Sequence, residues 1–248
     1  MKSLPAGRWR LLTLLVVLTG GCDIPGKPRE VDRPVRADQV KGFDALYGAR
    51  CAGCHGADGR LGPAPPLNDP VFLAIVPDAE LRHVISEGRA VTDAQKSPMP
   101  AFARARGGPL SAAQVQVLAE GIKKRWAPAA SGEAPPPYIS PAGGKVGNTD
   151  EGARVFAHAC AGCHGRQGQG GEQDGMPVGA INEPAFLALI SDQALRRTAI
   201  TGRPDLGMPG YDGTDGRPAD FRPLTSAEID DLVALLASWR QGSPASDK

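Results

Sequence analysis

The sequence Cys51-Ala-Gly-Cys54-His55 occurs early in the chain, and the same five residues return as Cys160-Ala-Gly-Cys163-His164. In each copy two thiols stand three positions apart, which places them on one turn of a helix, and an imidazole follows directly. Two identical pentapeptides of this composition in 248 residues are very improbable by chance. The pattern therefore indicates a chemical function that the chain performs twice.

The C-x-x-C-H pattern is typical of covalent attachment of c-type haem. Each thiol can add to one vinyl group of the same porphyrin, and the histidine can then bind the iron as the proximal ligand. We therefore predict two covalently bound haem c groups. The predicted attachment residues are Cys51, Cys54, Cys160 and Cys163, and the predicted proximal ligands are His55 and His164.

Two other uses of the cysteine pairs compete with haem attachment. A redox-active dithiol is disfavoured because a His and a Gly follow each pair and no βαβ pattern surrounds it. A zinc ribbon is disfavoured because 105 residues separate Cys54 from Cys160, which is far beyond ribbon spacing. One cysteine, Cys22, remains outside the two pairs, so the count leaves none for a disulfide.

The sixth iron ligands are predicted from an equal spacing in the two copies. Met99 lies 44 residues after His55, and Met208 lies 44 residues after His164. Each methionine is followed by a proline, which stiffens the loop that would hold the thioether against the iron. A single methionine would more often be core filler, but the repeated spacing favours Met99 and Met208 as ligands.

Other residues compete for the same role. Met176 is only 12 residues after His164, and the alignment of the copies places it in the loop on the proximal side. We expect Met176 to pack or to be exposed to solvent. His83 and His158 have no histidine at the equivalent position of the other copy, so we expect both on the surface. His83 remains a less favoured alternative as an iron ligand.

The repeat extends well beyond the ligands. Residues 72–82 match residues 186–196, and Gly88-Arg89 matches Gly202-Arg203. In each copy a helix is expected to run into the haem motif, at about 38–50 and at 149–159. A short middle helix is expected to open at Asp69-Pro70 and at Glu183-Pro184, and a further helix to be capped by Asp78 or Asp192. Capping boxes at Ser111 and Thr225 start the last helices, which Trp126 and Trp239 close.

These residues resemble the class I cytochrome c family, present twice and covering about residues 38–241. The resemblance rests on the aromatic residue before C-x-x-C-H-G, the following Gly/Pro loop and the Met-Pro loop. It implies an all-α fold, with two tandem domains of a few short helices wrapped around a haem. It also implies that a prolyl carbonyl accepts a hydrogen bond from the proximal histidine, and Pro63 and Pro177 are the nearest matches.

The chain organisation follows from composition. The predicted segments are a lipoprotein-type signal peptide at 1–21, a flexible tether at 22–37, a first cytochrome c domain at 38–127, a Pro/Gly-rich linker at 128–144, a second cytochrome c domain at 145–241 and a flexible tail at 242–248. The 32 glycines and 24 prolines favour short helices separated by structured loops and argue against a large sheet.

The N-terminus resembles a bacterial export signal with a lipid attachment site. Lys2, Arg8 and Arg10 precede the apolar stretch 11–18, and small residues then lead to Cys22, the predicted site of lipidation. The stretch is too short to span a bilayer, and an ordinary cleaved signal with an unmodified cysteine is the alternative. We therefore expect a lipid-anchored protein on the periplasmic side of a bacterial membrane.

The predicted function is one-electron transfer by a membrane-tethered dihaem cytochrome. A formal charge of +1 is unsuited to nucleic-acid binding, and iron with two protein ligands has no position for a small-molecule substrate. Its partners would be redox proteins of a respiratory chain, such as a quinol-oxidising complex and a terminal oxidase or reductase. One alternative is a fixed haem subunit of such a complex. A less favoured alternative is a dihaem enzyme such as a peroxidase.

Overall fold

A computed structural model of the chain describes residues 34–62, 64–89, 99–127, 134–141, 147–173 and 175–241. The predicted signal peptide, Cys22, the tail at 242–248 and part of the linker lie outside these residues. The chain divides into two units, Met1–Gln39 and Val40–Lys248, and both copies of the repeat belong to the second unit. In the first unit a short 3-10 turn occupies Ala37–Gln39.

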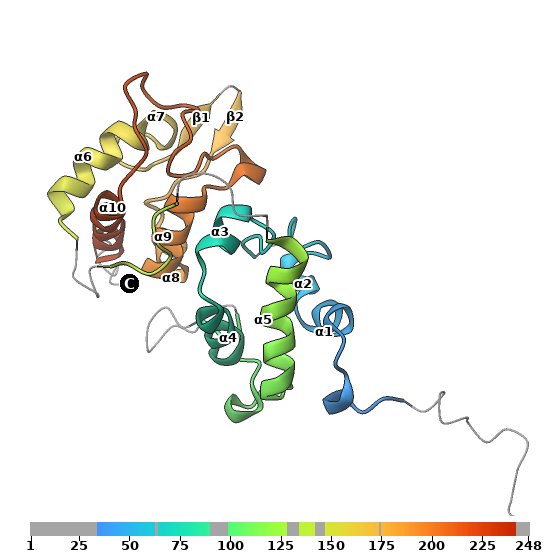
Figure 1. Cartoon of the computed structure of the whole chain (residues 1–248). Helices are drawn as coiled ribbons and strands as arrows, with labels where there is room; N and C mark the ends of the chain where they lie inside the picture. Colours follow the sequence, from blue (N-terminus) through green and yellow to red (C-terminus); the bar gives the residue numbers. More distant parts are fainter. Residues whose placement is uncertain are drawn as a thin grey trace, which may run out of the picture. The chain divides into compact units, whose positions relative to one another are not determined.

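The second unit is mostly helical, as the sequence predicts, and its elements follow the chain as labelled in Figure 1. The helices of the first copy are α1 (Phe43–Arg50), α2 (Ala52–His55), α3 (Pro70–Ile75), α4 (Asp78–Glu87) and α5 (Ala112–Trp126). Those of the second copy are α6 (Thr149–Ala159), α7 (Ala161–His164), α8 (Pro184–Leu189), α9 (Asp192–Thr201) and α10 (Ser226–Ser238). Short 3-10 turns occupy Arg104–Arg106, Pro204–Leu206 and Trp239–Gln241.

Most of the predicted helix starts are confirmed. Ser111 and Thr225 each form a complete capping box, with the N3 side chain bonded back to the cap. Asp69 accepts a hydrogen bond from the Phe72 amide at 2.7 Å, and a proline occupies the first turn of both α3 and α8. These caps satisfy backbone N–H groups that have no partner inside the helix.

Two local expectations are wrong. The first helix begins at Phe43 and not at residue 38, with a 3-10 turn and an extended segment before it. Asp78 and Asp192 are the first residues of their helices and not the caps, which are Pro77 and Ser191. Carboxylates at these positions are favourable in another way, because they face the positive end of the helix dipole.

One element is not expected from the sequence. In the longer haem loop of the second copy, β1 (Gly171–Gln173) pairs antiparallel with β2 (Met176–Val178). The register sets Glu172 opposite Pro177, and the turn between them includes Gly175 with φ +77°. The hairpin accommodates the five extra residues of this loop, and the fold otherwise remains all-α.

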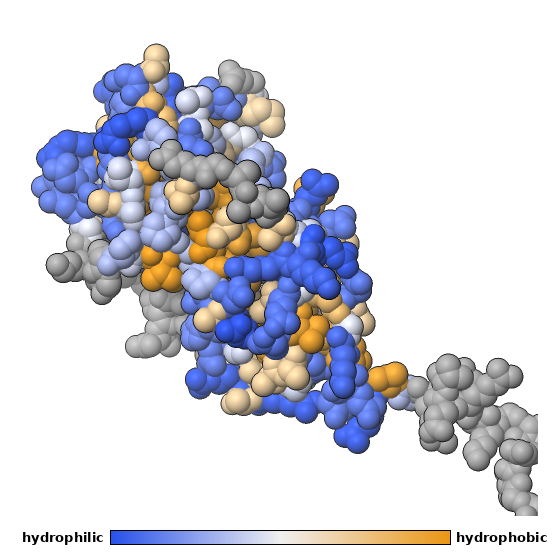
Figure 2. All heavy atoms as spheres, viewed as in Figure 1, coloured by the Kyte–Doolittle hydropathy of each residue, from blue (hydrophilic) through white to orange (hydrophobic). Residues whose placement is uncertain are grey.

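Buried apolar side chains form two clusters, one built mainly from each copy. In the first, α5 supplies Val115, Leu118 and Ile122, and in the second, α10 supplies Ile229 and Leu232. These are the positions at which apolar residues recur three or four apart. Figure 2 shows hydrophobic residues between hydrophilic ones on the face drawn. Large apolar side chains that remain exposed include Leu61, Met176, Leu189 and Leu206.

The described part of the linker is packed into the second unit. The side chain of Tyr138 is 1% exposed, and its ring meets Phe72 edge-on with centroids 5.9 Å apart. Its hydroxyl accepts a hydrogen bond from Arg89 at 2.7 Å. Its carbonyl accepts hydrogen bonds from Gln193 at 2.7 Å and from Arg196 at 3.2 Å. Tyr138 therefore contacts side chains from both copies of the repeat.

Candidate haem sites

The C-x-x-C-H segments adopt the same local structure in both copies. Cys51 is the C-cap of α1, and its amide donates to the carbonyl of Tyr47 at 2.8 Å. Cys160 ends α6 in the same way, with its amide 2.9 Å from the carbonyl of Phe156. A single helical turn, α2 or α7, then carries the second cysteine and the histidine. The two thiols therefore lie about one turn apart, with the imidazole directly after the second, as attachment to one porphyrin requires.

The four cysteines of the two motifs are not in disulfide bonds. Burial raises the pKa of Cys51 to about 11, and burial likewise raises the pKa of Cys160 to about 11. A redox-active dithiol needs a thiolate stabilised near neutral pH, which is the opposite trend. Within the described residues, no group of three or more His, Cys, Asp and Glu side chains is placed to hold a metal ion. The raised thiol pKa disfavours the dithiol alternative.

Each motif histidine is oriented by a backbone carbonyl. His55 Nδ1 lies 2.9 Å from the carbonyl oxygen of Pro65, and His164 Nδ1 lies 3.4 Å from that of Gly179. A proton on Nδ1 donates to these oxygens and leaves the lone pair of Nε2 for the iron. Burial lowers the pKa of both histidines, which favours the neutral imidazole that a metal ligand must be.

The acceptors of these hydrogen bonds lie two residues beyond the expected positions. The resemblance points to Pro63 and Pro177, of which Pro63 lies outside the described residues. Pro177 stands in β2 opposite Glu172, so the chain reaches the imidazole two positions later, at Gly179. Pro65 and Gly179 are equivalent in the alignment of the copies, so the two sites agree with each other.

The two methionine loops are held alike. Gly88 ends α4 with φ +72°, and a β-carbon built on it would lie 2.5 Å from the carbonyl oxygen of Met99. Gly202 ends α9 with φ +66°, and its β-carbon would lie 2.5 Å from the carbonyl oxygen of Met208. Only glycine allows both this backbone conformation and this close approach. Each Met-Pro segment is thus pressed onto the end of the preceding helix.

The aromatic residue three positions after each methionine anchors the same loop. The amide of Phe102 donates to the carbonyl of Ile85 at 3.1 Å, and that of Tyr211 donates to the carbonyl of Ile200 at 3.0 Å. Met99 and Met208 are both half-buried. By contrast, Met176 in β2 is 68% exposed, in agreement with the expectation for that residue.

Aromatic side chains also pack beside each motif. The Tyr47 hydroxyl donates to the carbonyl of Gly56 at 2.8 Å, and its ring meets Trp126 with centroids 5.2 Å apart. In the second copy the rings of Phe156 and Trp239 meet at 5.3 Å. These contacts tie the helix before each motif to the last helical segment of the same copy.

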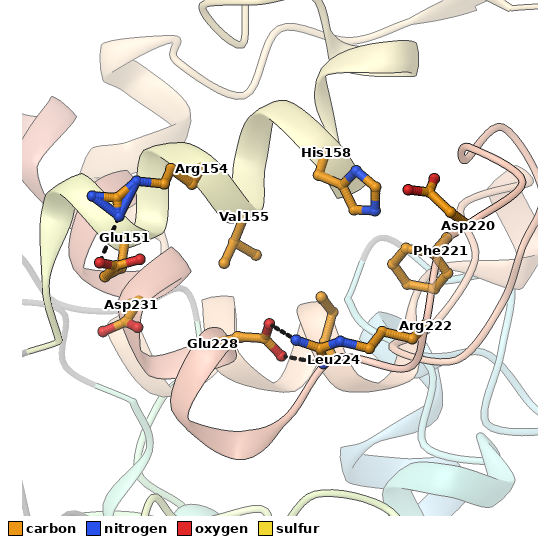
Figure 3. A pocket seen from close by; sticks show the side chains of 10 residues that line it. All are labelled: Glu151, Arg154, Val155, His158, Asp220, Phe221, Arg222, Leu224, Glu228 and Asp231. Carbon is orange, nitrogen blue, oxygen red and sulfur yellow. Dashed lines mark hydrogen bonds and ion pairs between the residues drawn. The ribbon is translucent and has the colours of Figure 1, made fainter.

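The remaining histidines are exposed, as expected, on α4 (His83) and on α6 (His158). The ring of His158 stacks on Phe221 at the edge of an open surface pocket of about 390 Å³, which Figure 3 shows. The pocket is lined largely by charged side chains and contains none of the motif residues. No helix in the described parts of the chain is long and apolar enough to cross a membrane.

Each copy thus presents two thiols, an oriented imidazole and a fixed methionine loop. This arrangement defines a class of protein that holds haem c covalently and transfers electrons. Residues 149–240 match the family model described as Cytochrome c, and residues 38–120 match the model described as Cytochrome C oxidase, cbb3-type, subunit III. The chain belongs to the class I c-type cytochromes and carries two haem c groups, one in each copy.

Two individual relatives are similar to the chain. It is 29% identical over 158 residues to the cbb3-type cytochrome c oxidase subunit CcoP of Azospirillum brasilense, covering 60% of this chain. The chain spans about half (47%) of the length of that curated relative. The solved structure of reduced recombinant cytochrome c4 from Pseudomonas stutzeri covers 80% of this chain and is itself covered to 98%, at 17% identity and a TM-score of 0.22.

Proposed function

We propose that the chain transfers single electrons through two haems bound by equivalent residues in domains 38–127 and 145–241. The proposed thioether positions are Cys51, Cys54, Cys160 and Cys163, the proximal ligands are His55 and His164, and the sixth ligands are Met99 and Met208. When bound, haem c supplies one-electron exchange between ferric and ferrous iron. The chain would supply the iron ligands, their orientation and the apolar surroundings.

The residues of each site have distinct tasks. The carbonyls of Pro65 and Gly179 fix the ring orientation of the proximal histidines and make the imidazoles better donors. The thioether sulfur of a methionine favours the reduced metal, which raises the reduction potential. With a histidine and a methionine as its two protein ligands, each iron would offer no open position for a substrate.

The single observation that carries this proposal is the matched restraint of the two methionines. A β-carbon built on Gly88 would lie 2.5 Å from the carbonyl oxygen of Met99, and one built on Gly202 would lie 2.5 Å from that of Met208. The equal backbone geometry supports one shared role for the two methionines in domains whose loops differ in length. The same observation speaks against a dihaem peroxidase, because such an enzyme needs one iron with an open or exchangeable position.

The proposed location is the periplasmic side of a bacterial membrane, through a lipid on Cys22. The charged and apolar pattern of residues 1–22 supports export and lipidation. Residues 22–37, with no apolar periodicity, would serve as a tether between the membrane and the first domain. Redox proteins of a respiratory chain would then be the electron donor and acceptor.

A second candidate is a fixed haem subunit of a terminal oxidase. It is favoured by the match of residues 38–120 to the cbb3-type subunit III model and by the similarity to CcoP. The two candidates share their chemistry and differ in association. Purification from native membranes in mild detergent separates them. A carrier migrates alone on a sizing column, and a subunit migrates with oxidase activity.

A further inference from the structure

The segment after the second methionine is longer than its counterpart in the first copy. Met99 is 11 residues before Leu110, whereas Met208 is 16 residues before the equivalent Leu224. We refer to residues 209–223 as the cover loop. Its extra residues make a contact that has no counterpart among the described residues of the first copy.

The cover loop lies directly on the attachment turn of the second haem. A β-carbon built on Gly216 would be 2.7 Å from the sulfur of Cys163, and one built on Gly162 would be 2.9 Å from the carbonyl oxygen of Gly216. At Gly53, the equivalent of Gly162, no described atom lies within 4 Å of such a β-carbon. Consistently, Cys54 is exposed and Cys163 is half-buried.

One side chain fastens this loop. Arg217 donates from Nη1 to the carbonyl oxygens of Gly210 at 2.8 Å and Gly213 at 2.6 Å, and from Nε to that of Ala159 at 3.2 Å. Gly210 follows Met208 by two residues, and Ala159 directly precedes Cys160. The guanidinium thus connects the methionine loop to the last residue of α6, where the attachment segment begins.

An aromatic stack supports the arginine. The guanidinium carbon of Arg217 lies 4.2 Å from the centroid of the Phe221 ring. Phe221 in turn stacks on His158 of α6, with centroids 6.2 Å apart and an interplanar angle of 28°. Figure 3 shows His158 on the helix and Phe221 on the loop facing each other across the pocket rim. A planar fork that bonds three carbonyls and stacks on a ring is suited to arginine and not to lysine.

We propose that Arg217 is a positioning residue that locks the cover loop over the second haem and thereby holds Met208 on its iron. The proposal rests on the proposed ligation by Met208. The first haem has no such lock within the described residues, so the two haems differ in how readily the methionine leaves. A methionine that leaves exposes the iron to external ligands, and carbon monoxide is a probe of that exposure for ferrous haem.

The test compares carbon monoxide uptake by the reduced dihaem protein. In Arg217→Gln we expect uptake to be about tenfold faster than in the wild type, at up to one haem per chain, because charged hydrogen bonds to three carbonyls are lost. Arg217→Lys should fall between them. Arg222→Gln is the matched control, since Arg222 lies in the same loop but is exposed and pairs with Glu228. Equal uptake by Arg217→Gln, Arg222→Gln and the wild type would overturn the proposal.

Two further measurements keep the outcomes distinct. If Met208→Ala does not open one haem to carbon monoxide, the ligand assignment fails, whereas if it does and Arg217→Gln does not, only the role of Arg217 fails. Hydrogen exchange on the wild-type holoprotein covers the case in which the variants do not fold. The amides of Gly213 and Arg217 in the cover loop, and those of Arg106 and Gly107 in the first copy, all donate to the carbonyl three residues earlier. The first pair should then exchange more slowly than the second, and equal rates would contradict the lock.

Discussion

The backbone of Met208 closes on Gly202 so tightly that a β-carbon on the glycine would lie 2.5 Å from the methionine carbonyl oxygen. The same distance separates a β-carbon on Gly88 from the carbonyl of Met99. A glycine at the end of a helix is common because the chain often turns there with positive φ. Here the glycine has a second task, because it allows the loop with the proposed ligand to pack on the helix end.

We therefore expect Gly88→Ala and Gly202→Ala each to loosen the methionine of its own domain. The positive φ and the steric overlap together should lower the free energy of unfolding by about 1–3 kcal/mol. The sulfur-to-iron charge-transfer band in the red part of the spectrum should weaken by up to half, since one of two haems is affected. Denaturant titration and absorbance spectroscopy measure the two effects.

The matched control is Gly107→Ala. Gly107 also has positive φ (+82°), but no described atom lies within 4 Å of a β-carbon built on it. It should lose stability through backbone strain alone and keep the charge-transfer band at full intensity. A loss of that band in Gly107→Ala equal to the loss in Gly88→Ala would show that strain, and not the contact with Met99, is responsible.

Replacement of the proposed sixth ligands should change one haem at a time. Met99→Ala and Met208→Ala should each lower the reduction potential of one haem and open that iron to carbon monoxide, because the thioether that favours the ferrous state is lost. Potentiometric titration and carbon monoxide difference spectra measure both effects. Met176→Ala, at an exposed position, should leave both haems unchanged. If Met176→Ala opens the second haem and Met208→Ala does not, the assignment in that domain is wrong.

Substitutions at the buried linker residue Tyr138 should lower the stability of the fold to different extents. Tyr138→Ala removes a fully buried ring that packs on Phe72 and should cost about 3–5 kcal/mol. Tyr138→Phe keeps the ring and loses only the hydrogen bond from Arg89, which should cost about 1 kcal/mol. Thermal unfolding gives the order of stability, and limited proteolysis should cleave the linker faster in the alanine variant. Equal resistance of all three proteins would contradict a structural role for this segment.

The proposed anchor is tested by cell fractionation. Cys22→Ala should be exported with both haems attached and should move from the membrane fraction to the soluble periplasm. Two or three acyl chains give stable attachment, whereas their complete loss leaves no apolar anchor of comparable strength. Retention of Cys22→Ala in washed membranes would mean that an uncleaved signal or a partner complex holds the protein there.

Much of the fold can be predicted because its signals are local. The capping boxes at Ser111 and Thr225 and the prolines at Pro70 and Pro184 act within one turn, so the residue types alone predict them. The start of the first helix is harder to place, because its N-cap is Gly42, which makes no side-chain capping bond, whereas Asp38 is of a residue type that often caps helices. The hairpin β1–β2 is not predicted, because strands of only three residues are too short to show an alternating apolar pattern.

The candidate sites divide in the same way. Spacing alone predicts the two C-x-x-C-H turns and the two Met-Pro loops. It does not predict that Pro65 and Gly179 orient the histidines. Every residue has a carbonyl, and the path of the loop decides which carbonyl oxygen lies next to the imidazole. Spacing also does not predict the contacts of Arg217. Its hydrogen-bond partners are backbone oxygens, which every residue has, so the residue types do not identify them. A signal is nevertheless present, because the five extra residues after Met208 mark the loop.

The ligation of both haems by a histidine and a methionine is tested most directly by the sulfur-to-iron charge-transfer band of the oxidised protein. Its intensity is measured against the haem content found after denaturation in pyridine. We predict two covalently bound haems per chain, with the full band intensity of two methionine-ligated irons. Half that intensity, or a haem content near one per chain, would contradict this ligation.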